Sequence, residues 1–399
     1  MVDLREVNEY KPEVFWKLPF LDELSVAMSG YDFEYVFPSI RGVQAGREYF
    51  VTMCPLKLIP RIFLFDEEEL RPELRAQRGL NKQRVPEMCR YLLENREDYT
   101  FSALTASIDG DVKFEPVGEE DSERHMGRLR VPMEARFVIN DGQHRRAAIE
   151  AALHEDPDLG YETIAVVFFL DHGLERCQQM FADLNRFPIR PTRSLGILYD
   201  HRDELAVLSK ELVDRIDVFR DLCETEKTSI SNRSTKLITL SAVYTATRIL
   251  LRELEFDSID ERVDAAVGFW SKVVDHMPDW QQARDRVVRS AELRRDFIHP
   301  YGLALSSIAR VGNVLLRDHP RSWEKTLSKL ESLDWSRGNT DQWEGRALVA
   351  GRVSKRNINI VLTANLIKEH LGLSLTDEEQ EAERQLKESR NGVPSRRTE

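Results

Sequence analysis

Long apolar runs and cysteine pairs are both missing from this chain of 399 residues. The longest uninterrupted apolar run, Ile164–Leu170, is far shorter than the roughly 20 residues that a membrane-spanning helix needs. The four cysteines form no CxxC pair, which excludes the usual zinc and disulfide frameworks. The first ten residues, MVDLREVNEY, lack the apolar stretch of a secretory signal. We therefore expect a cytoplasmic protein with reduced thiols and no membrane partner.

Basic residues are fewer than acidic residues: the chain has 57 Lys and Arg and 69 Asp and Glu, which gives a formal net charge of −12. This balance argues against a nucleic-acid partner unless the charges are segregated. Three windows contain no acidic residue: Leu184–Tyr199, Lys227–Arg252 and Arg346–Lys368. Such windows can form one basic face on an acidic protein, and the alternative is three solvated helix faces.

The hydrophobic pattern divides the chain into two kinds of sequence. Residues 31–202 alternate between short strands and helices, with strands expected at Tyr49–Met53, Ile59–Phe65, Arg136–Ile139 and Ile164–Leu170, helices at Asn81–Glu97, Arg145–Leu153 and Leu174–Leu184, and a hairpin over Thr100–Phe114. Residues 203–373 are helical almost throughout and show no clear strand. The predicted fold is α+β: a lead over 1–30, an α/β domain over 31–202, an all-α domain over 203–373, and an exposed charged helix with a flexible tail over 374–399. A capping box at Thr376–Glu379 opens that last helix.

The most informative stretch is an apolar strand, Phe137–Asn140, followed by Asp141, Gly142, Gln143, His144 and Arg145. A strand, a tight glycine turn and a helix whose first turn is basic form a potential anion site, because helix N-termini attract negative charge. Asp141 can hold Mg²⁺ or orient Arg145, and Gln143 can position a water molecule. The alternative is an ordinary capped turn with solvated basic side chains.

Basic residues in the acid-free windows are the candidate DNA contacts, because Arg and Lys are the usual partners of backbone phosphates. They are Arg146 at the turn together with Arg190, Arg193, Lys227, Arg233, Lys236, Arg352, Lys355 and Arg356. Asn185 and Arg186 join the residues of the turn as candidate nucleotide or phosphate contacts. For the later two windows, a helix packed in an all-α core is the competing interpretation.

The string DGQHR at residues 141–145 resembles the signature of the DGQHR-domain family. The surrounding sequence resembles the DndB-like members of that family, which belong to DNA phosphorothioation systems. Further blocks resemble the same family: Phe181–Arg186 with Arg190–Leu195, then Leu198–Asp203, then Glu224–Ser229. The resemblance extends from about Tyr31 to Ile367. It implies a DNA-binding regulator that acts with the phosphorothioation proteins and controls their expression.

The same turn is also similar to the nucleotide-binding box of the ParB/sulfiredoxin superfamily, which implies a ParB/sulfiredoxin-like fold for the α/β domain. Gly142, Arg145 and Ala148 match the ParB box, whereas Gln143 replaces its Glu. Gln143 also stands where sulfiredoxins carry their reactive cysteine, and an amide cannot serve as a thiol nucleophile. ATP or another NTP with Mg²⁺ is therefore the candidate cofactor, and sulfiredoxin chemistry is not expected.

The favoured function is a DNA-binding transcriptional repressor whose DNA affinity responds to nucleotide. Its expected partners are double-stranded DNA, other phosphorothioation proteins and further copies of the chain. One alternative is an enzyme, either a nucleotide hydrolase or a DNA-nicking protein, in which Asp141, Gln143 and His144 are catalytic. Another is an adaptor for the modification enzymes.

Overall fold

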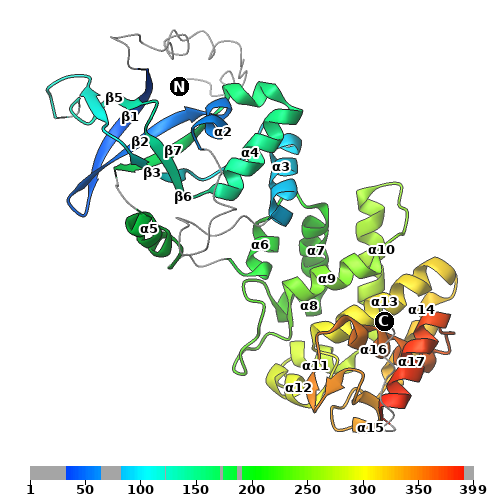
Figure 1. Cartoon of the computed structure of the whole chain (residues 1–399). Coiled ribbons are helices and arrows are strands. Elements are labelled where there is room, and N and C mark those ends of the chain that lie inside the picture. Colours follow the sequence, from blue (N-terminus) through cyan, green and yellow to red (C-terminus); the bar gives the residue numbers. More distant parts are fainter. Residues whose placement is uncertain (1–32, 64–81, 122, 171–173, 187–190, 391–399) are drawn as a thin grey trace, which may run out of the picture. The chain divides into compact units, whose positions relative to one another are not determined.

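The computed structural model describes residues 33–63, 82–121, 123–170, 174–186 and 191–390 (Figure 1). The chain divides into two compact units, residues 1–189 and residues 190–399. The division precedes the predicted boundary at residue 202, because the helix at Arg193–Tyr199 packs with the helices that follow it. The mixed α/β character of the first unit and the helical character of the second are as predicted from the sequence.

The first unit is built on one seven-stranded sheet with the order β4-β5-β1-β2-β7-β3-β6. Only the pairing of β3 with β7 is parallel, and the other pairings are antiparallel. The strands are β1 (Glu34–Gln44), β2 (Arg47–Pro55), β3 (Leu104–Asp109), β4 (Lys113–Pro116), β5 (Met126–Pro132), β6 (Arg136–Asp141) and β7 (Thr163–Leu170).

The sheet is strongly curled. Five strand spacings separate β3 from β4, which would be about 24 Å in a flat sheet, yet the link of residues 110–112 can span only about 14 Å. The two ends of the sheet must therefore approach each other. Ring contacts inside the curl agree, since Phe137 of β6 lies 5.9 Å from Tyr35 of β1 and 5.6 Å from Phe168 of β7, measured between ring centroids.

Helices pack around this sheet. The short helices α2 and α3 both contact α4, and α5 lies against β6 (Figure 1). These elements are η1 (Leu56–Leu58), α2 (Ile59–Ile62), η4 (Lys82–Arg84), α3 (Val85–Glu94), α4 (Gln143–Glu155), η5 (Pro157–Tyr161) and α5 (Leu174–Arg186). The core between them contains the inward side chains of the sheet and apolar residues of α2, α3 and α4.

Two sequence-based predictions for this unit are wrong. The expected strand at Ile59–Phe65 begins instead as helix α2, because Pro60 occupies a helix N-terminus and Ile59 and Ile62 are buried at a spacing of three residues. The expected hairpin over Thr100–Phe114 does not form either, since β3 pairs with β6 and β7 while β4 pairs with β5. The turn after Asp109 connects β3 to β4, which are far apart in the strand order but are brought together by the curl of the sheet.

The second unit is helical and surrounds α13, which packs against α9 and α16. Its helices are α6 (Arg193–Tyr199), α7 (Glu204–Arg215), α8 (Asp217–Leu222), α9 (Leu240–Leu250), α10 (Ile259–Asp275), α11 (Pro278–Arg284), α12 (Ser290–Asp296), α13 (Gly302–Asp318), α14 (Trp323–Leu327), η6 (Ser328–Ser332), α15 (Thr340–Trp343), α16 (Asn357–Leu371) and α17 (Asp377–Arg390). Trp270, Trp280 and Trp343 are fully buried in its core.

This unit also contains strands, which the sequence did not indicate. They are the two-residue strands β8 (Cys223–Glu224), β9 (Ile238–Thr239), β10 (Leu348–Val349) and β11 (Arg352–Val353), which pair as β8 with β9 and β10 with β11. Two residues are too few to give a period-two pattern, so the hydrophobic pattern of the sequence does not predict these strands.

The buried imidazole of His299 predicts a pH-dependent stability. Its Nδ1 accepts from Trp280 Nε1 at 2.8 Å and its Nε2 lies 3.1 Å from Asp279 Oδ2. Burial lowers the pKa of His299, and the contact with Asp279 opposes this only in part. On acidification, His299 therefore binds a proton at a higher pH in the unfolded chain than in the folded chain. The free energy of unfolding should fall as the pH drops below about 6.5.

Urea unfolding between pH 7.5 and 5.5 measures this effect. His299→Gln should show a smaller loss of stability over this range than the unsubstituted protein. His201→Gln, at an exposed position, should leave the pH dependence unchanged. An identical pH dependence in the His299 variant would contradict the prediction.

Candidate functional site

The strand–turn–helix motif forms as predicted. β6 ends at Asp141, Gly142 adopts the left-handed conformation at φ 112°, and α4 begins at Gln143. A Cβ atom at Gly142 would lie 2.4 Å from Cδ2 of Leu104 in β3. Both the backbone angle and the close approach therefore require glycine here.

Arg145 is engaged by its own surroundings in this turn. Its Nη2 lies 2.6 Å from Asp141 Oδ2, and its Nη1 donates to the carbonyl oxygen of Ser102 at 3.1 Å and to the Ser102 hydroxyl. The side chain of Arg145 is 13% exposed, whereas that of Asp141 is 46% exposed. Asp141 thus orients Arg145 and still presents part of its carboxylate to solvent.

The other predicted residues of this site differ in accessibility. Gln143 is buried and His144 is half-buried, and both interact with other groups. Helix α5 approaches the motif through Met180, whose Sδ lies 2.9 Å from Nδ2 of Asn140. Arg186 ends α5 with an exposed side chain that also has a partner, and the structure describes only the backbone of Asn185.

Arg146 does not fit its predicted role in DNA contact. It is 6% exposed, its Nε donates to the carbonyl oxygen of Phe63 at 2.9 Å, and its Nη1 pairs with Glu150. A guanidinium buried in this way joins α4 to the end of α2 and cannot reach a phosphate without leaving the core. We therefore remove Arg146 from the candidate DNA contacts.

The second unit brings the start of the second acid-free window beside the first. Residues 224–237, here called the basic loop, lie beside the start of α6; they include Glu224 and Glu226, which precede that window. Ser194 of α6 donates to the carbonyl oxygen of Lys227 at 2.9 Å, and Thr192 donates to that of Glu226. Arg193, Lys227 and Arg233 are exposed, whereas Lys236 is half-buried and donates to the carbonyl oxygen of Asp221. Arg190 lies outside the described residues.

A half-buried arginine, Arg294, holds the basic loop against α12. Arg294 of α12 donates from Nη2 to the carbonyl oxygens of Ser231 at 2.9 Å and Ser234 at 3.1 Å, and from Nη1 to that of Lys236. Burial lowers the pKa of Arg294, but a guanidinium in a protein remains protonated. Its three carbonyl partners fix the loop without neutralising this charge.

Two further arginines belong to the same surface, although the sequence analysis did not select them. Arg193 lies 5.7 Å from the ring centroid of Tyr244 in α9. Arg248 follows Tyr244 by one turn of the same helix, and its positive charge partly offsets the rise that burial causes in the pKa of Tyr244. Arg289 is exposed directly before Ser290, which donates to the carbonyl oxygen of Thr235 in the basic loop at 2.6 Å. Arg289 escaped the search for acid-free windows because Asp285 and Glu292 flank it, yet Asp285 is paired with Arg284.

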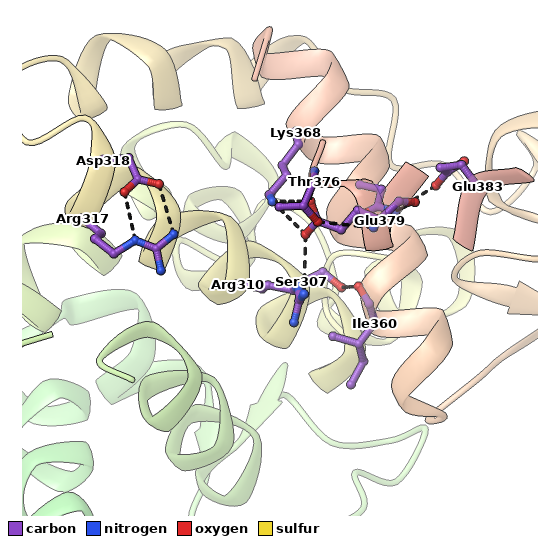
Figure 2. A network of polar contacts seen from close by, with 10 residues as sticks. Ser307, Arg310, Arg317, Asp318, Ile360, Lys368, Thr376, Glu379 and Glu383 are labelled. Atoms are coloured by element: carbon purple, nitrogen blue, oxygen red, sulfur yellow. Dashed lines mark hydrogen bonds and ion pairs between the residues drawn. The ribbon is translucent and has the colours of Figure 1, made fainter. Parts of the chain in front are cut away.

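The ends of the third window are buried and paired with the last helix. Arg346 makes a two-pronged contact with Glu383 at 2.5 and 2.6 Å. Figure 2 shows Lys368 and Arg310 converging on Glu379, with Lys368 Nζ 2.7 Å from its Oε2. Burial alone would raise the pKa of Glu379, but Lys368, the Thr376 amide and Arg310 together lower it.

These contacts correct the expectation that residues 374–399 begin with an exposed helix. The capping box does form, since Glu379 N donates to Thr376 Oγ1 and Thr376 N donates to Glu379 Oε2. However, Glu379 and Glu383 are 3% and 5% exposed, so α17 packs against the rest of the unit through buried carboxylates as well as through the buried Leu386. A search for apolar periodicity cannot detect such a face.

The middle of the third window remains accessible. Arg352, Lys355 and Arg356 are exposed around the start of α16. Arg356 borders a shallow cavity of about 270 Å³ between α16 and α17, together with Ile358 and Leu386. These three cations form a second, smaller candidate contact surface.

Neither a metal site nor a membrane helix is found in the part of the chain that the structure describes. No group of three or more His, Cys, Asp or Glu side chains there could hold a metal ion. No helix there is long and apolar enough to cross a membrane.

A comparison with protein-family models matches residues 37–374 to DndB, described as DNA-sulfur modification-associated. The chain belongs to the DndB family. DndB membership associates it with a DNA sulfur modification system. The DndB match includes the strand–turn–helix motif, α6 and the basic loop, and it ends before α17. No curated protein and no solved structure matches the chain.

The buried pair of Arg346 and Glu383 predicts a large effect on stability. Glu383→Gln leaves the Arg346 charge buried without a carboxylate, which should lower the free energy of unfolding by about 3–5 kcal/mol. Urea unfolding followed by tryptophan fluorescence measures the change.

The control is Glu381→Gln on the same helix, because Glu381 pairs with Arg384 in an exposed position. Its effect should stay below about 1 kcal/mol. Equal effects of the two substitutions would show that the buried pair does not anchor α17.

Proposed function

We propose that this chain is a DNA-binding transcriptional repressor of a DNA sulfur modification system, and that the basic loop and α6 contact the DNA backbone. Family membership supports the association with DNA modification. The observation that carries the proposal is the basic loop itself, which presents exposed Lys227 and Arg233 and is fixed by Arg294 through three carbonyl oxygens.

A preformed loop suits this task for two physical reasons. Ordering a flexible loop on binding costs conformational entropy, and a loop that is already fixed avoids this cost. The exposed Lys227 and Arg233 of the loop and the exposed Arg193, Arg248 and Arg289 beside it outnumber the exposed acid of the loop, Glu226, on a chain of net charge −12. Phosphate contacts set position and affinity, while a smaller number of side chains read the bases.

The test is fluorescence anisotropy with a duplex from the promoter of the chain's own operon, across a salt series. A scrambled duplex serves as the DNA control. Tighter binding to the promoter together with a steep salt dependence is the expected result. Weak binding to both duplexes would contradict the proposal, and salt-sensitive binding to modification proteins instead of DNA would identify an adaptor.

A double substitution locates the interface. Lys227→Ala with Arg233→Ala should weaken binding to both duplexes and reduce the slope of log K against log salt by about 2, one for each lost phosphate contact. Lys325→Ala with Lys387→Ala, at exposed sites on α14 and α17, is a matched loss of two surface charges and should change neither quantity. The triple substitution of Arg352, Lys355 and Arg356 by Ala tests the second surface. If only the triple variant loses affinity, the interface lies at the start of α16.

The strand–turn–helix motif supports a second candidate function, binding of ATP or another NTP with Mg²⁺. The exposed part of Asp141 fits a role in holding Mg²⁺ together with the nucleotide's own phosphates. The ion pair of Arg145 with Asp141 would then have to exchange for contacts with the nucleotide. Loss of calorimetric NTP binding in Asp141→Ala supports this function, and absence of any NTP binding by the unsubstituted protein refutes it.

The same variant tests the enzyme alternative. Loss of NTP-dependent phosphate release or of DNA nicking in Asp141→Ala would identify an enzyme.

We further propose that the repressor acts as a homo-oligomer, since an even number of copies matches a palindromic operator. Sedimentation with and without promoter duplex measures the number of copies. A monomer in both states would contradict this proposal.

A further inference from the structure

Gly196 occupies the middle of α6, and the described residues give no structural reason for a glycine there. Its backbone is helical and its φ angle is not positive, so no strained turn requires glycine. Apart from its chain neighbours and the backbone of α6, no heavy atom of the described residues would lie within 4 Å of a Cβ atom at this position, so no close packing there requires glycine either. Glycine is nevertheless among the least favourable residues inside a helix, because it loses the most backbone freedom.

Gly196 lies between two large exposed side chains on one face of α6. Successive residues turn by 100°, so Arg193, Gly196 and Tyr199 fall within an arc of about 120°. All three are exposed, and Tyr199 has 70% of its surface accessible. The opposite face, with Ser194 and Ile197, is buried. The exposed face thus has a cation at one end, a bare backbone in the middle and an aromatic ring at the other end.

The charge around this face favours a polyanion. No acidic residue occurs from Leu184 to Tyr199, and the exposed Lys227 belongs to the loop segment that Ser194 holds against α6. Two acids border this face, and each has a cation beside it. Asp200 follows Tyr199 and lies near Lys210 and Arg202, and Glu226, whose carbonyl oxygen accepts from Thr192, directly precedes Lys227. A sugar–phosphate backbone can approach a helix closely where no side chain intervenes.

We infer that the Arg193–Gly196–Tyr199 face of α6 lies directly against duplex DNA, with Gly196 at the point of closest approach. This inference rests on the proposed DNA-binding function and assigns the closest contact to one helix. Arg193 contacts a phosphate, and the ring of Tyr199 packs against a sugar or a base.

The experiment compares Gly196→Ala with Gly268→Ala. Gly268 is a matched control, because it is also exposed inside a helix, α10, and a Cβ atom there would likewise have no heavy atom within 4 Å. Both substitutions should raise the urea midpoint, since alanine is the better helix former. Only Gly196→Ala should weaken promoter binding, by about tenfold or more, whereas Gly268→Ala should stay within about twofold.

A pair of substitutions at Tyr199 tests the other end of the face. Tyr199→Ala should weaken binding, and Tyr199→Phe should retain it, because the ring and not the hydroxyl makes the contact.

The outcomes separate this inference from the function on which it rests. If the unsubstituted protein binds no DNA, both fail. If it binds and Gly196→Ala binds equally well, the inference is overturned while the proposed function stands. If Gly196→Ala lowers the urea midpoint, the position is structural and the inference is also overturned. Retained DNA binding combined with loss of a protein partner would assign the face to that partner instead.

Discussion

The hydrogen bonds from Arg294 to the carbonyl oxygens of Ser231, Ser234 and Lys236 are the constraint on which the candidate interface depends. They attach the basic loop to α12, and the hydroxyl of Tyr301 in turn donates to the carbonyl oxygen of Arg294 at 2.6 Å. A carbonyl group satisfies a guanidinium donor but carries no net charge. The loop is therefore ordered by a cation whose field remains available to an approaching anion.

Arg346 and Lys368 of the same unit are buried and are paired in a different way from the half-buried Arg294. Their partners are the carboxylates of Glu383 and Glu379, so each pair is close to neutral. Pairing of this kind fixes α17 and adds little to the surface potential. The type of acceptor, carbonyl or carboxylate, thus decides whether a basic residue that fixes a segment keeps its net charge or is neutralised.

The sequence predicted the parts of this molecule that local patterns determine. The glycine turn at Gly142, the helical second unit and the basic segment of residues 227–236 follow from periodicity, backbone chemistry and charge. Strand order could not be predicted, because the pairing of β3 with β6 and β7 depends on contacts distant in sequence. The window of residues 346–368 was misleading for the same reason, since the acids that neutralise its ends arrive with α17.

The candidate site was predictable to a similar extent. Lys227, Arg233, Lys236 and Arg193 were found because their windows contain no acid. Arg289 was missed because Asp285 and Glu292 flank it in the sequence, although Asp285 is paired with Arg284. Arg146 was assigned to the surface, but it is buried, because the side of α4 that carries it packs against the end of α2. Linear charge patterns identify basic segments, but only the packing shows which of their side chains reach solvent.

The position of β7 in the sheet has a consequence for how the first unit is made. β7 is the last of the seven strands to be synthesised, yet it lies between β2 and β3 and joins the group β4-β5-β1-β2 to the pair β3-β6. Until residue 170 has left the ribosome, the two halves of the sheet have no strand to connect them, and their open edges can pair with other chains. The sheet of the first unit can therefore be completed only after its other six strands have been synthesised.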